Sequence, residues 1–331
     1  SIVLEWNLAV TAVVIGLPTT LYTMFGGVQA VTWADVKQMV VIVGAVSAAV
    51  AVLILGLPEG IGLGEALHVA GSTGRLETID FSFDLGETYT FWSGLFGGLV
   101  LMLGYFGCDQ SQVQRYLTAR SVDAGRRALL MSAFWKIPLQ ALILLTGVLV
   151  FIFYLFHEPP MLFNSTHANQ MRSGGQGSEY ASLETEFHDA FEQRREAADR
   201  MIDARRNGGS AEIAATREEF VATQARLEEV RVSAVGLVQQ VSGDNTYTDV
   251  NYVFPTFVTS RLPIGLVGLL IAAVFAAAMS SIAAELNALS ATTVMDFYRR
   301  HLRTEASDRH YLFVSKLTTA FWGVFATIFA L

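Results

Sequence analysis

Two adjacent serines interrupt a long apolar run in the last quarter of the sequence. Ser280 and Ser281 lie in the stretch "FAAAMSSIAAELNALSA", within residues 264–284, which carry no charged side chain. On a helix, residues four apart share one face, so the Ala277 carbonyl would lie beside the Ser281 hydroxyl and near that of Ser280. Because small hard cations bind oxygen ligands, three neutral oxygens at one point could hold a monovalent cation inside a membrane.

An ordinary structural role would also explain these serines. A serine in the middle of a helix often donates to the carbonyl four residues earlier, and neighbouring alanines favour close helix packing. For a pair flanked by residues 276–278, all alanine, both interpretations stay open. Glu285 and Asn287 follow, and we expect packing or interfacial roles for them, because an acidic side chain facing lipid is costly.

A single aspartate, Asp35, is the second polar group of interest. It ends the stretch "TWAD", in which Thr32 could be the N-cap of a helix and Asp35 would lie in its first turn. A carboxylate there would interact favourably with the helix dipole.

The elements that must position these groups are membrane helices. The chain has 331 residues, of which 52% are hydrophobic and only 16% charged, whereas a soluble domain has about 25% charged residues. About 20 apolar residues cross the hydrocarbon core of a bilayer. We therefore predict an all-α polytopic membrane protein, with a tight break at Gly26-Gly27 between its first two spans. The predicted spans are 3–24, 31–56, 91–108, 129–156, 263–297 and 311–331.

The distribution of charge predicts the orientation of these spans. Short loops rich in Lys and Arg stay in the cytoplasm, which places 109–128 and 298–310 inside. The acidic loop 57–90 and the long polar region 158–262 then lie outside. In the outer region, apolar residues recur at helical spacing through 183–240, with a break at the "NGGS" that begins with Asn207. This pattern predicts an antiparallel helical hairpin outside the membrane.

Other features of the sequence limit the classes of function. The one cysteine, Cys108, cannot form an internal disulfide, and a net charge of −8 does not favour a nucleic-acid partner. No nucleophile–base pair, metal-ligand cluster or nucleotide fingerprint occurs in the sequence, so we do not expect an enzyme. The chain begins without Met and ends inside an apolar run, so we expect an internal piece of a larger membrane protein.

Four stretches together resemble the sodium:solute symporter family, the group of the sodium–glucose and sodium–proline transporters. The serine-containing "AAAMSSIAAELNALSATTVMDFY" resembles the eighth core helix of that family. The residues 21–40, 104–136 and 249–273 resemble, in order, the junction of helices four and five, helix six with the start of helix seven, and the segment that leads into helix eight. The resemblance does not cover 165–245, so the hairpin looks like an insertion.

The resemblance implies a LeuT-like fold of five plus five helices in an inverted repeat, with ion and solute sites near the midplane. Residues 1–157 would hold core helices four to seven and residues 263–331 helices eight and nine, with 158–262 as the extracellular or periplasmic region. The first and tenth core helices would lie outside this chain. The implied function is sodium-driven symport of a small organic solute across the cell membrane, and we expect a bacterial inner membrane.

Candidate ion ligands follow from the same resemblance. It places the Ala277 carbonyl and the Ser280 and Ser281 hydroxyls on the coupling ion, Na⁺. Asp35 resembles an acidic residue of helix five near the inward sodium path, which in some members belongs to a second sodium site. Arg115 fits the basic inner loop first and a gating salt bridge second.

Candidate solute contacts follow as well. Tyr105 resembles the aromatic gate of helix six, although an ordinary packing tyrosine would look the same. Met102 stands where the sugar carriers have an asparagine, which argues against a sugar as substrate. Lys136 aligns with a lysine that contacts sugar, but its side chain could instead reach the cytoplasmic surface.

Two alternatives to sodium symport remain at this stage. A sensor or receptor could keep the transporter fold and use the outer hairpin to bind a partner, whose identity the sequence does not indicate. A proton-coupled symporter could use Asp35 as its titrating group. The serine pair favours sodium over protons.

Overall fold

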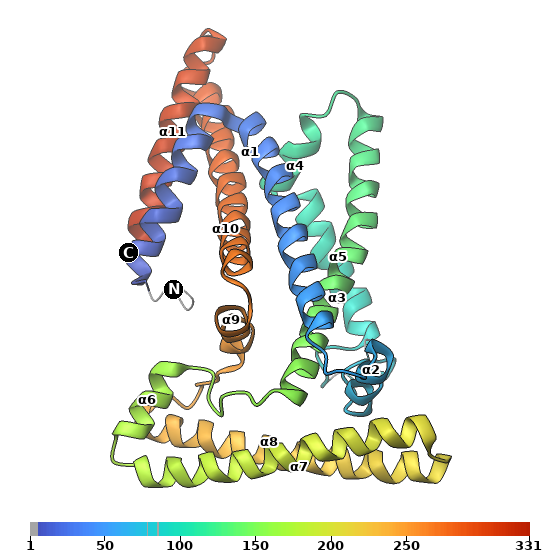
Figure 1. The fold of residues 1–331 in the computed structure, drawn as a ribbon. Coiled ribbons are helices and arrows are strands. Elements are labelled where there is room, and N and C mark those ends of the chain that lie inside the picture. The colour runs from blue at the N-terminus through green and yellow to red at the C-terminus, as the bar shows by residue number, and fades with distance from the viewer. Residues whose placement is uncertain (1–5, 78, 85) are drawn as a thin grey trace. The chain divides into compact units, whose positions relative to one another are not determined.

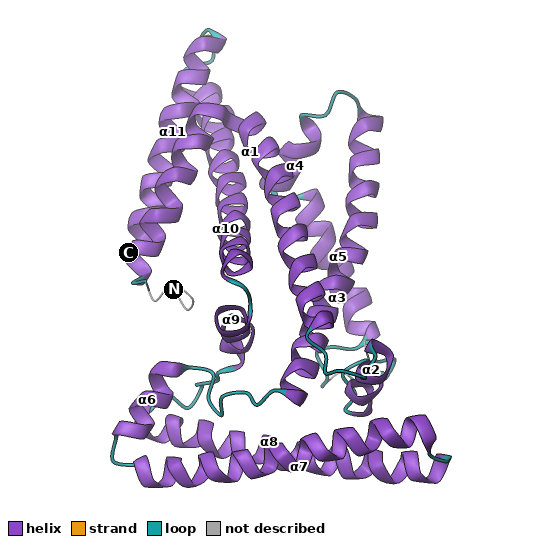
Figure 2. Cartoon of the chain, in the orientation of Figure 1, coloured by secondary structure: helices purple, strands orange, loops and turns teal. Residues whose placement is uncertain are grey.

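The computed structural model describes residues 6–77, 79–84 and 86–331, and the elements in these residues are helices (Figures 1 and 2). The chain divides into two compact units. The first comprises Ser1–Ser47, Ile79–Ala141 and Ile264–Leu331, and the second comprises Ala48–Thr78 and Leu142–Pro263. The helices are α1 (Leu8–Leu55), α2 (Leu63–Ser72), α3 (Phe91–Gly107), α4 (Gln110–Leu117), α5 (Val122–Phe156), α6 (Ser165–Ser173), α7 (Gly177–Asn207), α8 (Ser210–Ser242), α9 (Val250–Arg261), α10 (Ile264–Thr292), the π-helix η1 (Thr293–Leu302) and α11 (Asp308–Phe329).

The apolar helices match the predicted membrane spans. In the described residues, four helices are long and apolar enough to cross a membrane, namely α1, α5, α10 continued by η1, and α11; the pair α3 and α4, bent by 58°, would make a fifth. Helix α1 covers the first predicted span from Leu8 and the second as far as Leu55, while residues 3–5 of the first span lie outside the described residues. It is kinked at Gly27, whose φ of 55° is a conformation that glycine adopts without strain. Figure 1 shows its two limbs folded back at this kink. The predicted break is therefore confirmed.

Several helix boundaries differ from the predicted ones. Helix α5 begins at Val122 rather than 129, and α4 lies in the expected loop 109–128. Asp109 caps α4, since its Oδ1 accepts a hydrogen bond of 2.8 Å from the Ser111 backbone N–H. Helices α2 and α9 were not expected, because each is shorter than a span and lies in a polar region.

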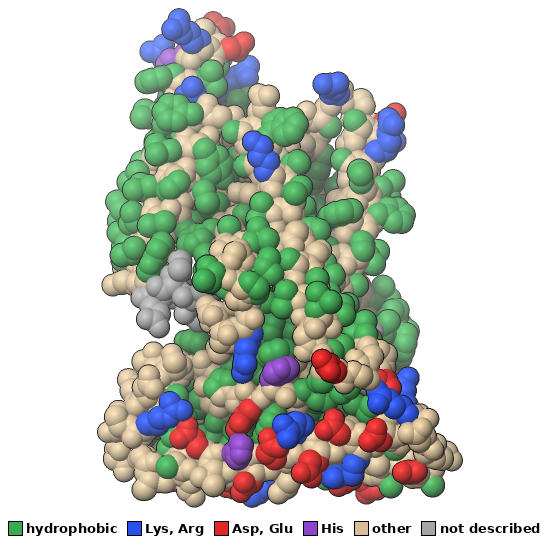
Figure 3. Space-filling view, in the orientation of Figure 1, with side chains coloured by type: hydrophobic (Ala, Val, Ile, Leu, Met, Phe, Trp, Pro, Cys, Tyr) green, Lys and Arg blue, Asp and Glu red, His purple; other side chains and the backbone are tan. Residues whose placement is uncertain are grey.

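Small residues allow close contact between helices of the first unit. An added Cβ at Gly323 of α11 would collide with the Thr20 side chain of α1, and one at Gly16 of α1 would collide with Thr327 of α11. Close backbone approach through glycine is typical of membrane helix packing. Figure 3 shows hydrophobic side chains over these helices, and many of them are exposed, as expected for a surface that faces lipid.

The second unit contains the predicted hairpin. Helices α7 and α8 run antiparallel and turn at Gly208 and Gly209, within the predicted break, so the hairpin is confirmed and extends over 177–242 (Figure 1). Figure 3 shows charged side chains of both signs on its surface. Its interior is mainly apolar and includes the buried Phe187, Phe191, Phe220, Leu227 and Val230.

Two buried polar contacts hold this unit together. The Arg194 guanidinium donates to the Tyr154 carbonyl at 2.6 Å and to the Gln224 side chain at 3.2 Å, which ties the hairpin to the end of α5. Burial lowers the pKa of Arg194 to about 10, so it stays charged at neutral pH. The buried Asp249 accepts from Arg231 Nη2 at 3.0 Å on both carboxylate oxygens.

Candidate ion and solute site

The second limb of α1 carries Asp35, but not as a capping residue. This limb is already helical before Thr32, whose hydroxyl donates to the Val28 carbonyl at 2.9 Å. The predicted capping box at Thr32 is therefore wrong. The helix resumes directly after the kink at Gly27, so Asp35 lies about two turns inside it and its carboxylate is free to contact other helices.

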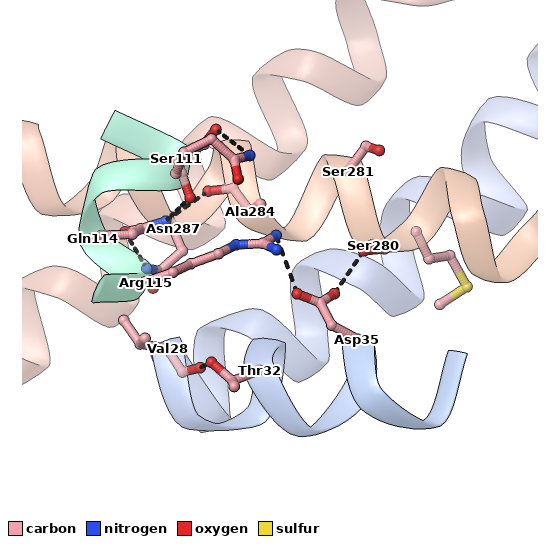
Figure 4. Close-up of polar contacts among 12 residues, drawn as sticks. Val28, Thr32, Asp35, Ser111, Gln114, Arg115, Ser280, Ser281, Ala284 and Asn287 are labelled. Atoms are coloured by element: carbon pink, nitrogen blue, oxygen red, sulfur yellow. Dashed lines mark hydrogen bonds and ion pairs between the residues drawn. The ribbon is translucent and has the colours of Figure 1, made fainter. Parts of the chain in front are cut away.

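Two side chains from other helices converge on the Asp35 carboxylate (Figure 4). The Ser280 hydroxyl of α10 donates to Oδ1 at 2.6 Å, and Arg115 Nη2 of α4 lies 3.1 Å from Oδ2. The side chain of Asp35 is 19% exposed and that of Arg115 is 38% exposed. Three segments that are distant in the sequence thus form one charged, partly buried cluster. Of the two roles considered for Arg115, the ion pair is the one observed.

The adjacent serine takes a different partner. The Ser281 hydroxyl donates to the Ala277 carbonyl at 3.3 Å, which is the structural alternative considered for both serines. Figure 4 shows the Ser280 and Ser281 side chains pointing in different directions. The three oxygens that we expected at one point therefore do not meet there. The Ser281 hydroxyl bonds to the Ala277 carbonyl, and the Ser280 hydroxyl bonds to Asp35. A carboxylate is a stronger acceptor than a helix carbonyl, which explains why Ser280 bonds to Asp35.

A buried amide pair positions α4 against α10. The Asn287 side chain donates to Gln114 Oε1 at 2.7 Å, and Gln114 Nε2 donates to the Ala284 carbonyl at 3.2 Å (Figure 4). Asn287 thus has the packing role expected of it. Gln114 was missed in the sequence, although Ser111 and Gln114 share the buried face of α4 at a spacing of three residues. Because Arg115 follows Gln114 directly, this pair also holds the guanidinium beside Asp35.

One further contact joins α1 to the serine region of α10. The Tyr22 hydroxyl, on the first limb of α1, donates to the Met279 carbonyl at 3.1 Å. This carbonyl precedes Ser280 directly, so both limbs of α1 contact the same turn of α10. Sequence reasoning missed Tyr22 because nothing in its local pattern distinguishes it from a packing residue.

The three candidate solute residues are only partly brought together. Lys136 Nζ of α5 lies 5.7 Å from the ring centroid of Tyr105 and 5.4 Å from that of Phe106, both on α3. These distances are in the range of cation–π contacts. Tyr105 is half-buried, whereas Lys136 is exposed and Met102 is 43% exposed, with its neighbours on α3 also exposed. No contact joins Met102 to the other two in the described residues.

The arrangement suits a monovalent cation better than a transition metal. In the described part of the chain, no group of three or more His, Cys, Asp or Glu residues could hold a metal ion. The Asp35 cluster instead offers one carboxylate and the Ser280 hydroxyl, and the separate Ser281–Ala277 pair offers a hydroxyl and a backbone carbonyl; all are hard oxygen donors. The guanidinium of Arg115 already balances the charge of Asp35, so a bound cation would have to compete with it.

Comparison with known families gives a broad match. The model of the "Sodium:solute symporter family" matches residues 1–169 and 231–331. The unmatched residues, 170–230, are most of the helical hairpin. This agrees with the expectation that the hairpin is an insertion into a membrane core of this type.

Characterised relatives match shorter stretches. A rabbit (Oryctolagus cuniculus) sodium-dependent multivitamin transporter is 34% identical over 171 residues, which are 51% of this chain and 25% of the relative. A human sodium/iodide cotransporter is 33% identical over 44% of this chain and 22% of its own length. The mouse (Mus musculus) sodium-coupled monocarboxylate transporter 2 is 31% identical over 46% of this chain and 24% of its own length. The chain thus spans about a quarter of these relatives.

A solved structure matches nearly the whole chain in fold. It is the substrate-bound outward-open state of a Na⁺-coupled sialic acid symporter, with a TM-score of 0.63 and 20% sequence identity. The match covers 98% of this chain and 50% of that one. The LeuT-like fold is thereby confirmed, with this chain accounting for half of the arrangement.

Proposed function

This chain belongs to the sodium:solute symporter family, and from that membership we propose that the full-length protein is a sodium-coupled symporter of a small organic solute. Members of the family are transporters, which confirms the prediction that the chain is not an enzyme. The observation that carries the proposal is the contact of Ser280 with Asp35, which places a carboxylate and a hydroxyl from two membrane helices on one point.

We propose that the coupling ion binds next to the serines of α10. Ala277 and Ser281 lie on an exposed face of this helix, with the carbonyl and the hydroxyl adjacent. The family resemblance assigns the remaining ligands to the first core helix of the full-length protein. Sodium would then break the hydrogen bond that Ser281 donates to the Ala277 carbonyl, and the hydroxyl oxygen of Ser281 would coordinate the ion. Neutral ligands hold such an ion weakly enough for it to leave.

The carboxylate of Asp35 has a separate role in this proposal. Arg115 acts as a tethered cation that neutralises Asp35 when no sodium ion is near. A sodium ion that reaches the carboxylate must displace the guanidinium of Arg115, which returns when the ion leaves. We favour sodium over proton coupling here because the Ser280 hydroxyl adds a second oxygen that a cation can use beside the carboxylate.

We further propose that the solute is an organic anion. Two relatives are named for iodide and monocarboxylate, and the similar structure is that of a sialic acid symporter. In this chain, Met102 replaces an amide that would bind sugar hydroxyls. Lys136 lies near the ring of Tyr105 and can supply the positive charge that a carboxylate needs.

The orientation proposed from the charged loops is retained. Loops 109–128 and 298–310 face the cytoplasm, and the region 158–262 with its hairpin faces the outside. The location is the cell membrane, which for a bacterial protein would be the inner membrane. A receptor that retains the fold is less favoured, because the relatives named above are transporters or cotransporters.

Sodium-dependent uptake by the full-length protein in proteoliposomes tests this proposal. Ser281→Ala removes one proposed ligand and keeps the helix, because alanine is the best helix former. We expect the sodium concentration for half-maximal uptake of a carboxylate solute to rise about tenfold, the effect of about 1.4 kcal/mol. The matched control is Ser290→Ala on the same helix, whose hydroxyl bonds to the Ser315 carbonyl at 2.9 Å.

Two results would contradict the sodium assignment. An unchanged sodium dependence in Ser281→Ala would show that this hydroxyl is not a ligand. Uptake driven by a pH gradient in sodium-free buffer would show proton coupling instead.

A further inference from the structure

A basic pocket lies in the second unit, between α2 and the turn of the hairpin, which pack together. It has a volume of about 390 Å³. Its polar lining includes His68 of α2, Arg205 of α7 and Arg217 of α8, and its apolar lining includes Leu67, Leu76 and Met201. Among the residues that the structure describes, no acidic residue lines it. The pocket contains none of the residues proposed for sodium or solute.

The two arginines of this pocket are distinguished by their lack of carboxylate partners. Among the described residues, neither Arg205 nor Arg217 forms an ion pair. The Arg205 side chain donates one hydrogen bond, to the Gly64 carbonyl at 3.1 Å, and the Arg217 side chain donates none. Most other arginines of the second unit pair with a carboxylate. These are Arg75, Arg172, Arg195, Arg200, Arg206, Arg226 and Arg231.

Glu65 of α2 does not form an ion pair with either arginine of the pocket. Glu65 of α2 is already bound by Arg206, whose Nε lies 2.6 Å from Oε1. That contact, with a smaller effect of Arg205, holds the pKa of Glu65 down at about 2, and the ion pair of Glu65 is with Arg206 rather than with either arginine of the pocket. Two guanidinium groups without an ion-pair partner among the described residues therefore line one cavity.

The histidine adds a neutral donor. His68 is half-buried, and its Nε2 atom is buried without a hydrogen-bond partner in the described residues. Burial, with smaller effects of Arg205 and Arg217, lowers the pKa of His68, so the ring is neutral at pH 7. A neutral imidazole can donate one N–H to an oxygen acceptor. A buried polar atom without a partner is costly, and a ligand oxygen would remove that cost.

From this arrangement we propose that the pocket binds an organic monoanion, with its charged oxygens against Arg205 and Arg217 and its apolar part against Leu67, Leu76 and Met201. Guanidinium groups bind carboxylate and phosphate oxygens through charge-assisted hydrogen bonds. A free carboxylate and the phosphate diester of a lipid headgroup share this chemistry. The site is additional to the transport site and does not require sodium.

Thermal unfolding of the full-length protein in detergent and sodium-free potassium salts tests the proposal. The probes are butyrate, its uncharged analogue butyramide, and dihexanoyl phosphatidylglycerol below its micellar concentration, at constant ionic strength with chloride. A ligand that binds the folded state raises the unfolding temperature in a saturable way. We expect this rise with butyrate or with the short-chain lipid, and none with butyramide.

Substitutions locate the effect. We expect the double variant Arg205→Gln/Arg217→Gln to weaken the apparent affinity at least about tenfold, since each charged hydrogen bond contributes strongly. Arg217→Gln alone removes no hydrogen bond or ion pair among the described residues, so it should fold and still show a weaker response. Arg195→Gln, which removes one positive charge from α7 outside the pocket, is the control and should respond like the parent.

The outcomes separate the sources of the anion. A rise with butyrate assigns a free carboxylate, and a rise with the lipid alone assigns a headgroup; both support the pocket. Equal rises with butyrate and butyramide, no rise with any of the three probes, or an unchanged response in Arg217→Gln and the double variant would overturn it. Because sodium is absent, the result does not depend on which ion drives transport.

Discussion

Opposite effects of two substitutions at one ion pair provide a sharp test of the proposed coupling. Asp35→Asn keeps an oxygen that can accept the Ser280 hydroxyl but removes the negative charge that would attract sodium. Arg115→Gln keeps the carboxylate and removes the cation that competes for it. We therefore expect Asp35→Asn to weaken sodium binding and Arg115→Gln to strengthen it.

The magnitude follows from the geometry of the pair. Unit charges about 4 Å apart interact by roughly 4 kcal/mol at an effective dielectric constant of 20, whereas exposed ion pairs contribute a net 0–1 kcal/mol, roughly. The Arg115 and Asp35 side chains are 38% and 19% exposed, with a closest approach of 3.1 Å. An intermediate value of about 1–2 kcal/mol corresponds to a change of about 5- to 30-fold in the sodium concentration for half-maximal uptake.

The assay is solute uptake by the full-length protein in proteoliposomes at a series of sodium concentrations. The Asp35→Asn variant should require more sodium and Arg115→Gln less, and the double variant should show how far the two effects depend on one another. Arg127→Gln serves as a control, because its side chain contacts the Asp123 carbonyl rather than Asp35. A shift in the same direction for both single variants would refute the competition between guanidinium and sodium.

Three further predictions concern stability. Gly323→Ala forces a methyl group into the facing side chain of α1 and should cost about 1–3 kcal/mol, read as a lower thermal midpoint in detergent. Asp249→Asn leaves Arg231 without its carboxylate and should cost about 3 kcal/mol, measured in the same way. The hydrogen bond that the His188 ring donates to the Glu158 carboxylate raises the pKa of His188 above its usual 6.5, so this pair stabilises the hairpin at low pH and the contribution is lost as the pH rises through the raised pKa. The thermal midpoint measured from pH 6 to 8 should fall by more in the parent than in His188→Gln, and equal slopes would contradict the role of the pair.

The sequence alone determined the features that depend on local pattern. Apolar runs of bilayer length predicted the membrane helices, and the Gly26-Gly27 pair predicted the break in α1. Both predictions could be made because each pattern involves only residues that are close together in the sequence. The periodicity of 183–240 likewise predicted the hairpin and its turn. The motif around Ser280 pointed to the family that the comparison then confirmed.

The tertiary structure decided which polar groups meet. Thr32 and Asp35 fit a capping box locally, but the helix starts earlier, and Asp35 instead contacts Ser280 and Arg115, far away in the chain. The two serines look equivalent in the sequence, yet only one of them lies within reach of a carboxylate. Such pairings could not be predicted from the sequence, because they depend on the packing of one helix against another, which no local pattern encodes.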